Sequence, residues 1–133
     1  GLFVPKDKPD KVERHFMNFC LHIIHGVRVG YSKLSWIDEN SPWKHLCIGS
    51  DLDGMINPIN GITTVLDYKY LKDELLKYLP IADKLLQTYP EIKGLKYDLQ
   101  GNLDKDFLGK AVDDFLYNNG ERFIVRFLQN WNI

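Results

Sequence analysis

The sequence has no long apolar run, no excess of charge of one sign and no internal repeat. No run of apolar residues approaches the roughly 20 needed to cross a bilayer, so we expect no transmembrane helix. The 17 basic and 18 acidic side chains leave a formal net charge of −1, whereas dedicated nucleic-acid binders carry a basic excess. Residues 1–9 also lack the apolar centre of a signal peptide. We therefore expect a cytoplasmic protein that binds no nucleic acid and spans no membrane.

Cysteine is scarce too: the two thiols, Cys20 and Cys47, form no C-x-x-C pair. Both lie within apolar segments, which predicts buried, reduced thiols and fits a reducing compartment. Hydrophobic residues, in contrast, make up 44% of the 133 residues, and aromatic residues 13%. That apolar content suffices for a sizeable core and excludes wholesale disorder, and the length predicts a single unit spanning 1–133.

Apolar periodicity predicts a mostly helical chain. In residues 10–29, Asp10 and Glu13 are spaced as an N-cap and its partner, and apolar residues recur three and four positions apart. Gly26 and Gly30 are expected to weaken or end this helix, and 31–44 to form a loop with one short turn. Further helices are expected over 69–79, from Pro80 to about 89, over 105–117, and after 118–120, where the last helix carries Phe123, Ile124, Phe127, Leu128 and Trp131.

The segment His45–Ser50 predicts a β-strand at about 45–50. It is short, apolar and without polar alternation, as in strands that are covered on both faces. A buried strand needs neighbours for its backbone N–H and C=O groups, and no second convincing strand is apparent. Either other strands have patterns too weak to recognise, or the chain is a piece of a larger α/β protein whose remaining strands lie elsewhere.

Two carboxylates follow this expected strand directly. Asp51 and Asp53, with Gly54 in the turn behind them, stand where ligands bind in α/β folds, at the carboxyl end of a strand. A carboxylate there can bind a divalent metal or move a proton from a metal-bound water. The alternative is structural, with both side chains accepting backbone N–H bonds of the turn.

The run His45-Leu-Cys-Ile-Gly-Ser-Asp-Leu-Asp-Gly54 resembles the last barrel-strand motif of the membrane dipeptidase (renal dipeptidase) family of the amidohydrolase superfamily. Cys47 and Leu52 stand where that motif has Gly and Phe. The helix with His22-Ile-Ile-His25 and the ending Asn119-Gly-Glu-Arg-Phe-Ile124 resemble segments of related enzymes. The resemblance implies a (β/α)8, or TIM-like, barrel with a zinc site, usually of two ions, that hydrolyses dipeptides and related amides through a metal-activated water.

Within that resemblance, Asp51 is the catalytic and metal-binding residue, which would hold the zinc-bound water and pass its proton to the leaving amine. Asp53 and Gly54 would shape the loop. The family takes further zinc ligands from a His-x-Asp motif, and neither His-x-Asp nor His-x-His occurs in this sequence. We therefore expect the C-terminal fragment of such a metallopeptidase barrel, in which zinc and a dipeptide-like substrate are held by the complete enzyme. Alone, the chain should be inactive and should not bind zinc tightly.

Two other functions stay open. Asp51-Leu-Asp-Gly54 also resembles the first motif of haloacid dehalogenase-like phosphatases, although Met55 replaces the expected Thr. The second is a non-catalytic interaction domain that self-associates through exposed apolar faces. His22 and His25, three apart on one expected helix, have the spacing of two metal ligands, but we expect partly buried packing histidines because a third ligand is not evident.

Overall fold

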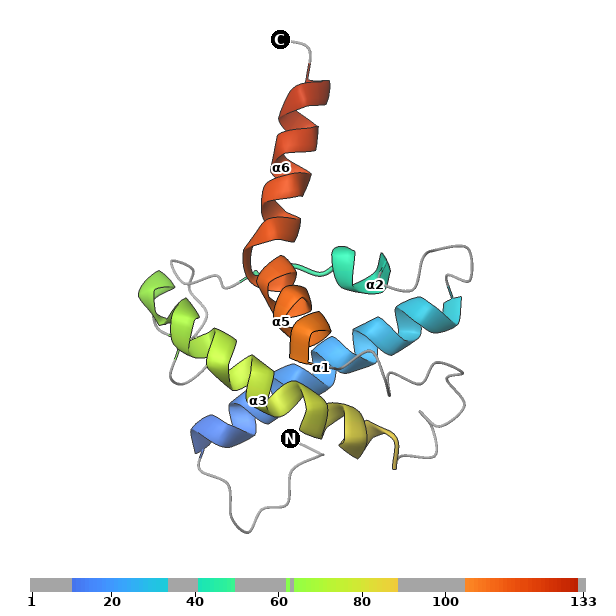
Figure 1. Ribbon diagram of the computed structural model, residues 1–133, viewed down its shortest axis with the longest axis vertical. Coiled ribbons are helices and arrows are strands. Elements are labelled where there is room, and N and C mark those ends of the chain that lie inside the picture. Colours follow the sequence, from blue (N-terminus) through green and yellow to red (C-terminus); the bar gives the residue numbers. More distant parts are fainter. Residues whose placement is uncertain (1–10, 34–40, 50–61, 63, 89–104, 132–133) are drawn as a thin grey trace.

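The computed structural model describes residues 11–33, 41–49, 62, 64–88 and 105–131. In chain order its elements are α1 (Lys11–Lys33), α2 (Ser41–Lys44), the 3-10 turn η1 (Val65–Asp67), α3 (Tyr68–Leu86), α5 (Lys105–Asp113), the π-turn η2 (Asp114–Asn118) and α6 (Asn119–Asn130). Figure 1 shows α3 crossing α1, with α5, η2 and α6 following one another in a single helical run.

The expected α/β fold is wrong for the part of the chain that the structure describes, because no β-strand occurs there. Residues 45–49 of the expected strand form a turn and irregular backbone, and Ser50 lies outside the described residues. The Ile48 N–H donates to the helical carbonyl of Phe115 at 3.1 Å, where a strand would bond to another strand. The described residues form a helical assembly, and a TIM-barrel fragment with a strand at 45–50 does not fit them.

The core lies between α1, α3 and α5 because each helix carries an apolar stripe with helical spacing. Burying each large side chain in such a core contributes about 1.5–3 kcal/mol of stability. The stripes predicted from the periodicity supply most of the core, which includes Phe16, Cys20, Ile23, Ile24, Val27, Leu71, Leu75, Leu79, Ala82, Leu108, Val112 and Phe115.

Two residues that were expected at helix boundaries lie inside helices, and the helices expected over 69–79 and from Pro80 form the single helix α3. Pro80 lies inside α3, although a proline in a helix interior costs about 3 kcal/mol. The stripe on either side of it stays in register, and both Leu79 and Ala82 are buried, so packing against α1 offsets that cost. Gly30 lies inside α1, where a Cβ would stand 2.9 Å from the Cβ of Pro42. Glycine at this position therefore lets α2 lie directly against α1.

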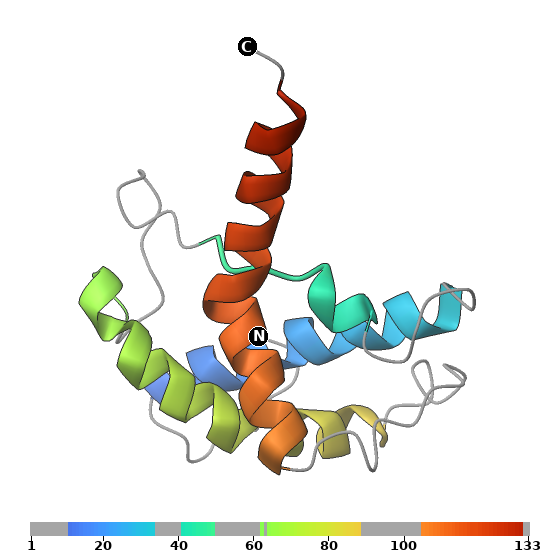
Figure 2. The same ribbon diagram turned by 45° about the horizontal axis from the view of Figure 1, so that its top comes forward.

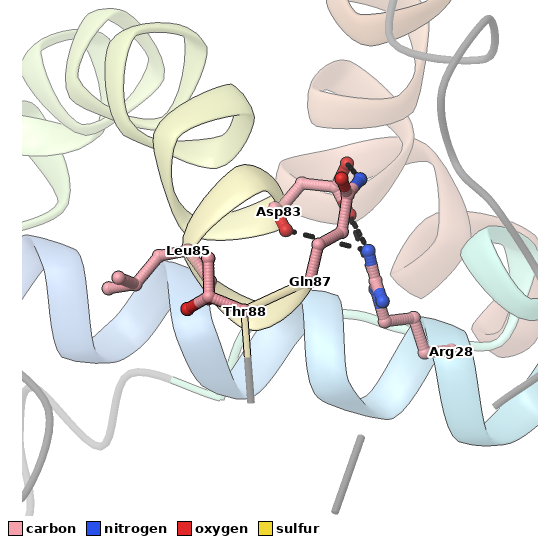
Figure 3. Close-up of polar contacts among 5 residues, drawn as sticks. All are labelled: Arg28, Asp83, Leu85, Gln87 and Thr88. Carbon is pink, nitrogen blue, oxygen red and sulfur yellow. Dashed lines mark hydrogen bonds and ion pairs between the residues drawn. The ribbon is translucent and has the colours of Figure 1, made fainter. Parts of the chain in front are cut away.

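A buried ion pair joins α1 to α3 (Figure 3). Arg28 donates through Nη2 to Asp83 Oδ1 at 2.6 Å and through Nε to the same oxygen at 3.2 Å. The second carboxylate oxygen, Oδ2, accepts a bond from Gln87 Nε2 at 3.2 Å. The two charged side chains are only 4% and 6% exposed, so these bonds replace the water that both charges lose on folding.

The last helix projects away from the other elements, as the two views in Figures 1 and 2 show. Every described residue from Glu121 to Trp131 is exposed. Phe123 is 72% exposed, and Phe127 and Trp131 stack edge-to-face with their ring centroids 4.6 Å apart. The sequence predicted this helix and its apolar residues correctly, but they do not contribute to the core.

Candidate functional site

The three residues assigned to the site from the sequence, Asp51, Asp53 and Gly54, lie outside the described residues. The structure does describe the first half of their motif, residues 45–49, and the segment that leads into it from α2. The geometry of the candidate site is therefore that of residues 43–48 and of the helical surface that holds them.

Asn119 is the residue that fixes this segment. Its side-chain amide nitrogen donates to the carbonyl oxygens of Trp43 at 2.8 Å and Leu46 at 2.7 Å. Its side-chain oxygen accepts a bond from Arg122 Nη2 at 2.5 Å. Asn119 belongs to residues 119–124 and Leu46 to residues 45–49, so the bond between them joins two of the segments in which the sequence resembles amidohydrolases.

The π-turn η2 supplies a third bond to the same segment. In an α-helix the Asn119 N–H would bond to the carbonyl of Phe115, four residues earlier. Here it bonds to the carbonyl of Asp114, five residues earlier, and the Phe115 carbonyl accepts the Ile48 N–H. π-turns of this kind occur frequently at functional sites, and this one joins the start of the motif to the helical core.

Side-chain contacts also join η2 to the first turn of α6. Asp114 is buried, and its Oδ1 lies 3.2 Å from Arg122 Nη2 and accepts a bond from Asn118 Nδ2 at 2.9 Å. Arg122 therefore bridges Asp114 and Asn119. This bridge orients the amide of Asn119 toward the two carbonyls that it binds.

Lys44 lines two hollows. The larger, about 320 Å³, is lined by Lys44, His45, Asn119, Arg122, Phe123 and Arg126. The smaller, about 170 Å³, is lined by Trp43, Lys44, Phe107, Lys110, Ala111 and Asp114. The sequence did not indicate either hollow, because each joins α2 to helices more than 60 residues further along the chain.

Trp43 forms a wall of the smaller hollow and packs into the core. Its ring meets that of Phe107 edge-to-face, with the centroids 6.0 Å apart. Its indole N–H is buried and finds no hydrogen-bond partner in the structure as described. A buried donor without a hydrogen bond lowers the stability of the folded state by about 1–3 kcal/mol.

The exposure of the histidines and cysteines differs from what the sequence predicted, except at Cys20. His22 and His25 are exposed on α1, so the expectation of partly buried packing histidines is wrong for this pair. Within the described ranges, no three His, Cys, Asp or Glu side chains gather as they would around a metal ion. Cys20 is buried as expected, and burial, with a smaller effect of the nearby Glu74 charge, raises its pKa from 9.0 to about 12. Cys47 is exposed, contrary to expectation.

Comparison with known proteins gives no family for this chain. A scan against models of protein families, a search of curated proteins and a search of solved structures each returned no match. Among the described helices, none combines the length and the apolar character that a bilayer crossing requires. The resemblance at residues 45–54 and 119–124 thus stands on those residues themselves.

Proposed function

We propose that this chain is the C-terminal part of a zinc-dependent dipeptidase or related amidohydrolase-like enzyme. The observation that carries the proposal is the acidic motif of residues 45–54, His-Leu-Cys-Ile-Gly-Ser-Asp-Leu-Asp-Gly. In such an enzyme Asp51 would supply a metal ligand and accept the proton of the attacking water, and Asp53 and Gly54 would shape the loop that presents it.

The anchoring of residues 43–48 supports this assignment. Three hydrogen bonds hold the backbone shortly before Asp51 in the sequence: two from Asn119 and one between Ile48 and Phe115. A catalytic carboxylate needs a fixed starting point, because a displacement of about 1 Å costs roughly a hundredfold in rate. The expected strand would have provided that point, and under this proposal the anchored residues 43–48 take its place.

The described residues do not fit a zinc site by themselves, because they gather no set of three metal ligands. Under this proposal the chain supplies one carboxylate, from Asp51, and further polypeptide supplies the remaining ligands. Zinc, when bound, would lower the pKa of its water and polarise the peptide carbonyl. No catalytic step is assigned to the chain alone.

The test measures zinc content and dipeptide hydrolysis of the longer polypeptide that includes this chain. Asp51→Asn should lower kcat by roughly 10²–10⁴-fold, the usual contribution of a general acid or base. Asp53→Asn is the matched control, since it removes a carboxylate two residues away, and it should retain more activity. Full activity in Asp51→Asn, or submicromolar zinc affinity of the isolated chain in a calorimetric titration, would contradict the proposal.

A second candidate function, self-association as a non-catalytic interaction module, is favoured by the exposed face of α6. Phe123, Phe127 and Trp131 are 72%, 51% and 56% exposed. Aromatic side chains bury about 150–250 Å² each, so these three leave roughly 300–400 Å² uncovered. Pairing with α6 of a second copy would cover that area and about half of the ~800 Å² that each partner buries in a standard interface.

Light scattering during size-exclusion chromatography distinguishes this candidate. A homodimer has twice the 15.5 kDa mass of the chain and should dissociate in Phe127→Asp. Gln129→Asp introduces the same charge on the same exposed helix and should leave the dimer intact. A monomer at all protein concentrations would reject self-association.

A further inference from the structure

The larger hollow, at the base of α6, gathers basic side chains, and none of the described residues that line it is acidic. Lys44 and His45 line it from the end of α2, and Arg122 and Arg126 line it from α6. The two arginines are four residues apart and so lie on the same face of their helix. In a chain whose net charge is −1, this concentration of positive charge is local and does not follow from composition.

The charges in this hollow are unequally compensated. Arg122 is bound to Asn119 and lies 3.2 Å from Asp114. Arg126 forms no ion pair with any described residue, and the acidic residue nearest to it in sequence, Glu121, accepts a bond from Tyr117 at 3.3 Å. Arg126 therefore presents a guanidinium whose five N–H donors suit a carboxylate or phosphate.

One wall of the hollow is apolar. Phe123 lines it and is 72% exposed. On α6 it lies on the same face as the exposed Phe127 and Trp131, which follow at intervals of four residues. A volume of about 320 Å³ lies at the lower end of the range for small-molecule sites, which are typically about 300–1,000 Å³. The site thus combines cationic donors for a charged group with an aromatic surface beside them.

We propose that this hollow binds an organic anion, in which a carboxylate or phosphate is carried next to an apolar group. Arg126 binds the anionic group, Arg122 and Lys44 add their charges to the hollow while Arg122 holds Asn119, and Phe123 packs against the apolar part. This binding needs neither zinc nor Asp51, so it holds or fails independently of the hydrolase function.

The test titrates the ¹⁵N-labelled chain with three probes at constant ionic strength and follows amide shifts by NMR. N-acetyl-L-phenylalanine and phenyl phosphate both carry a phenyl group, but differ in the anionic group. N-acetyl-L-phenylalanine amide keeps the phenyl group and lacks the charge. At least one anionic probe should bind with a Kd of about 1 mM, which is usual for a ligand of this size, and shift the amides of residues 44, 45 and 122–126. The tighter of the two anionic probes identifies the charged group.

The variants replace side chains outside the core, so they should leave the fold unchanged. Arg126 is exposed, so Arg126→Gln should fold normally and weaken binding of the anionic probes roughly tenfold, and Arg126→Lys should restore part of the affinity. Lys110→Gln is the matched control, because Lys110 lines the neighbouring hollow, and it should leave binding unchanged. Any one of three results would overturn the proposal. The uncharged amide binds as tightly as the anions, neither anion gives a saturable shift up to about 20 mM, or Arg126→Gln binds the anions with unchanged affinity.

Discussion

Removing the charge of Asp83 should destabilise the protein more than any single surface change. In Asp83→Asn the Arg28 guanidinium stays buried between α1 and α3, with its side chain 4% exposed and without a carboxylate. Breaking a buried pair from one side costs about 3–5 kcal/mol, because it leaves a charge that has lost its water and gained no partner. A domain of this size is stable by only about 5–15 kcal/mol, so this loss is a large share of the total.

Urea unfolding followed by circular dichroism measures the effect. Asp83→Asn should lower the midpoint by roughly 2 M, given a slope of about 1–3 kcal/mol per molar urea. The matched control is Asp113→Asn, which breaks the exposed pair of Lys72 and Asp113, at 2.6 Å with side chains 39% and 50% exposed. That control should change the unfolding free energy by no more than about 1 kcal/mol.

A double variant separates the loss of the pair from the burial of a lone charge. Arg28→Met with Asp83→Leu removes both charges and keeps an apolar contact between α1 and α3. Replacing both partners of a buried pair by apolar residues is often neutral or stabilising, so the double variant should be more stable than either single variant. A loss below about 1 kcal/mol in Asp83→Asn, or a double variant worse than both singles, would refute this reasoning.

Three further outcomes follow from the described contacts. Gly30→Ala should cost about 1–3 kcal/mol in urea unfolding, because the new Cβ would stand 2.9 Å from that of Pro42; a neutral result would mean that α2 does not press on α1. Asn119→Ala should cost a similar amount, roughly 1–3 kcal/mol, since it releases two carbonyls at 2.8 and 2.7 Å, whereas equal stability would argue against its anchoring role. In native protein a disulfide reagent should modify exposed Cys47 and spare Cys20. Because folding raises the Cys20 pKa from 9.0 to about 12, its contribution to stability is complete below pH 9 and should be lost progressively between pH 9 and 12. In urea unfolding, Cys20→Ala should therefore lose less stability over that pH range than the unchanged chain does.

The parts of the fold that were predictable depend on local periodicity. The stripes of α1 and α3 were recognisable because residues three and four apart share a helix face, as Phe16 and Cys20 do, whatever the rest of the chain does. Helix ends were less predictable. Pro80 and Gly30 weaken helices intrinsically, but the burial of their neighbours decides the outcome, and burial depends on segments distant in sequence.

The strand at 45–50 was mispredicted for a related reason. A short apolar run is equally compatible with a buried strand and with irregular backbone packed on helices. What decides between them is the partner of the Ile48 N–H, a carbonyl in η2. The bonds from Asn119 span 73 and 76 residues, so the hollow at the base of α6 could not be read from any local pattern.

The length of the turn between α5 and α6 determines the direction in which the protruding helix presents its aromatic rings. Each residue advances a helix by roughly 100° about its axis. The π-turn takes one residue more than an α-turn to close its hydrogen bond, from the Asn119 N–H to the Asp114 carbonyl. Winding the same five residues as an ordinary α-helix, with none removed, would therefore rotate the rings at 123, 127 and 131 by about that angle relative to the core. A substitution that converts this turn to α-helix would redirect the exposed surface without altering any of its side chains.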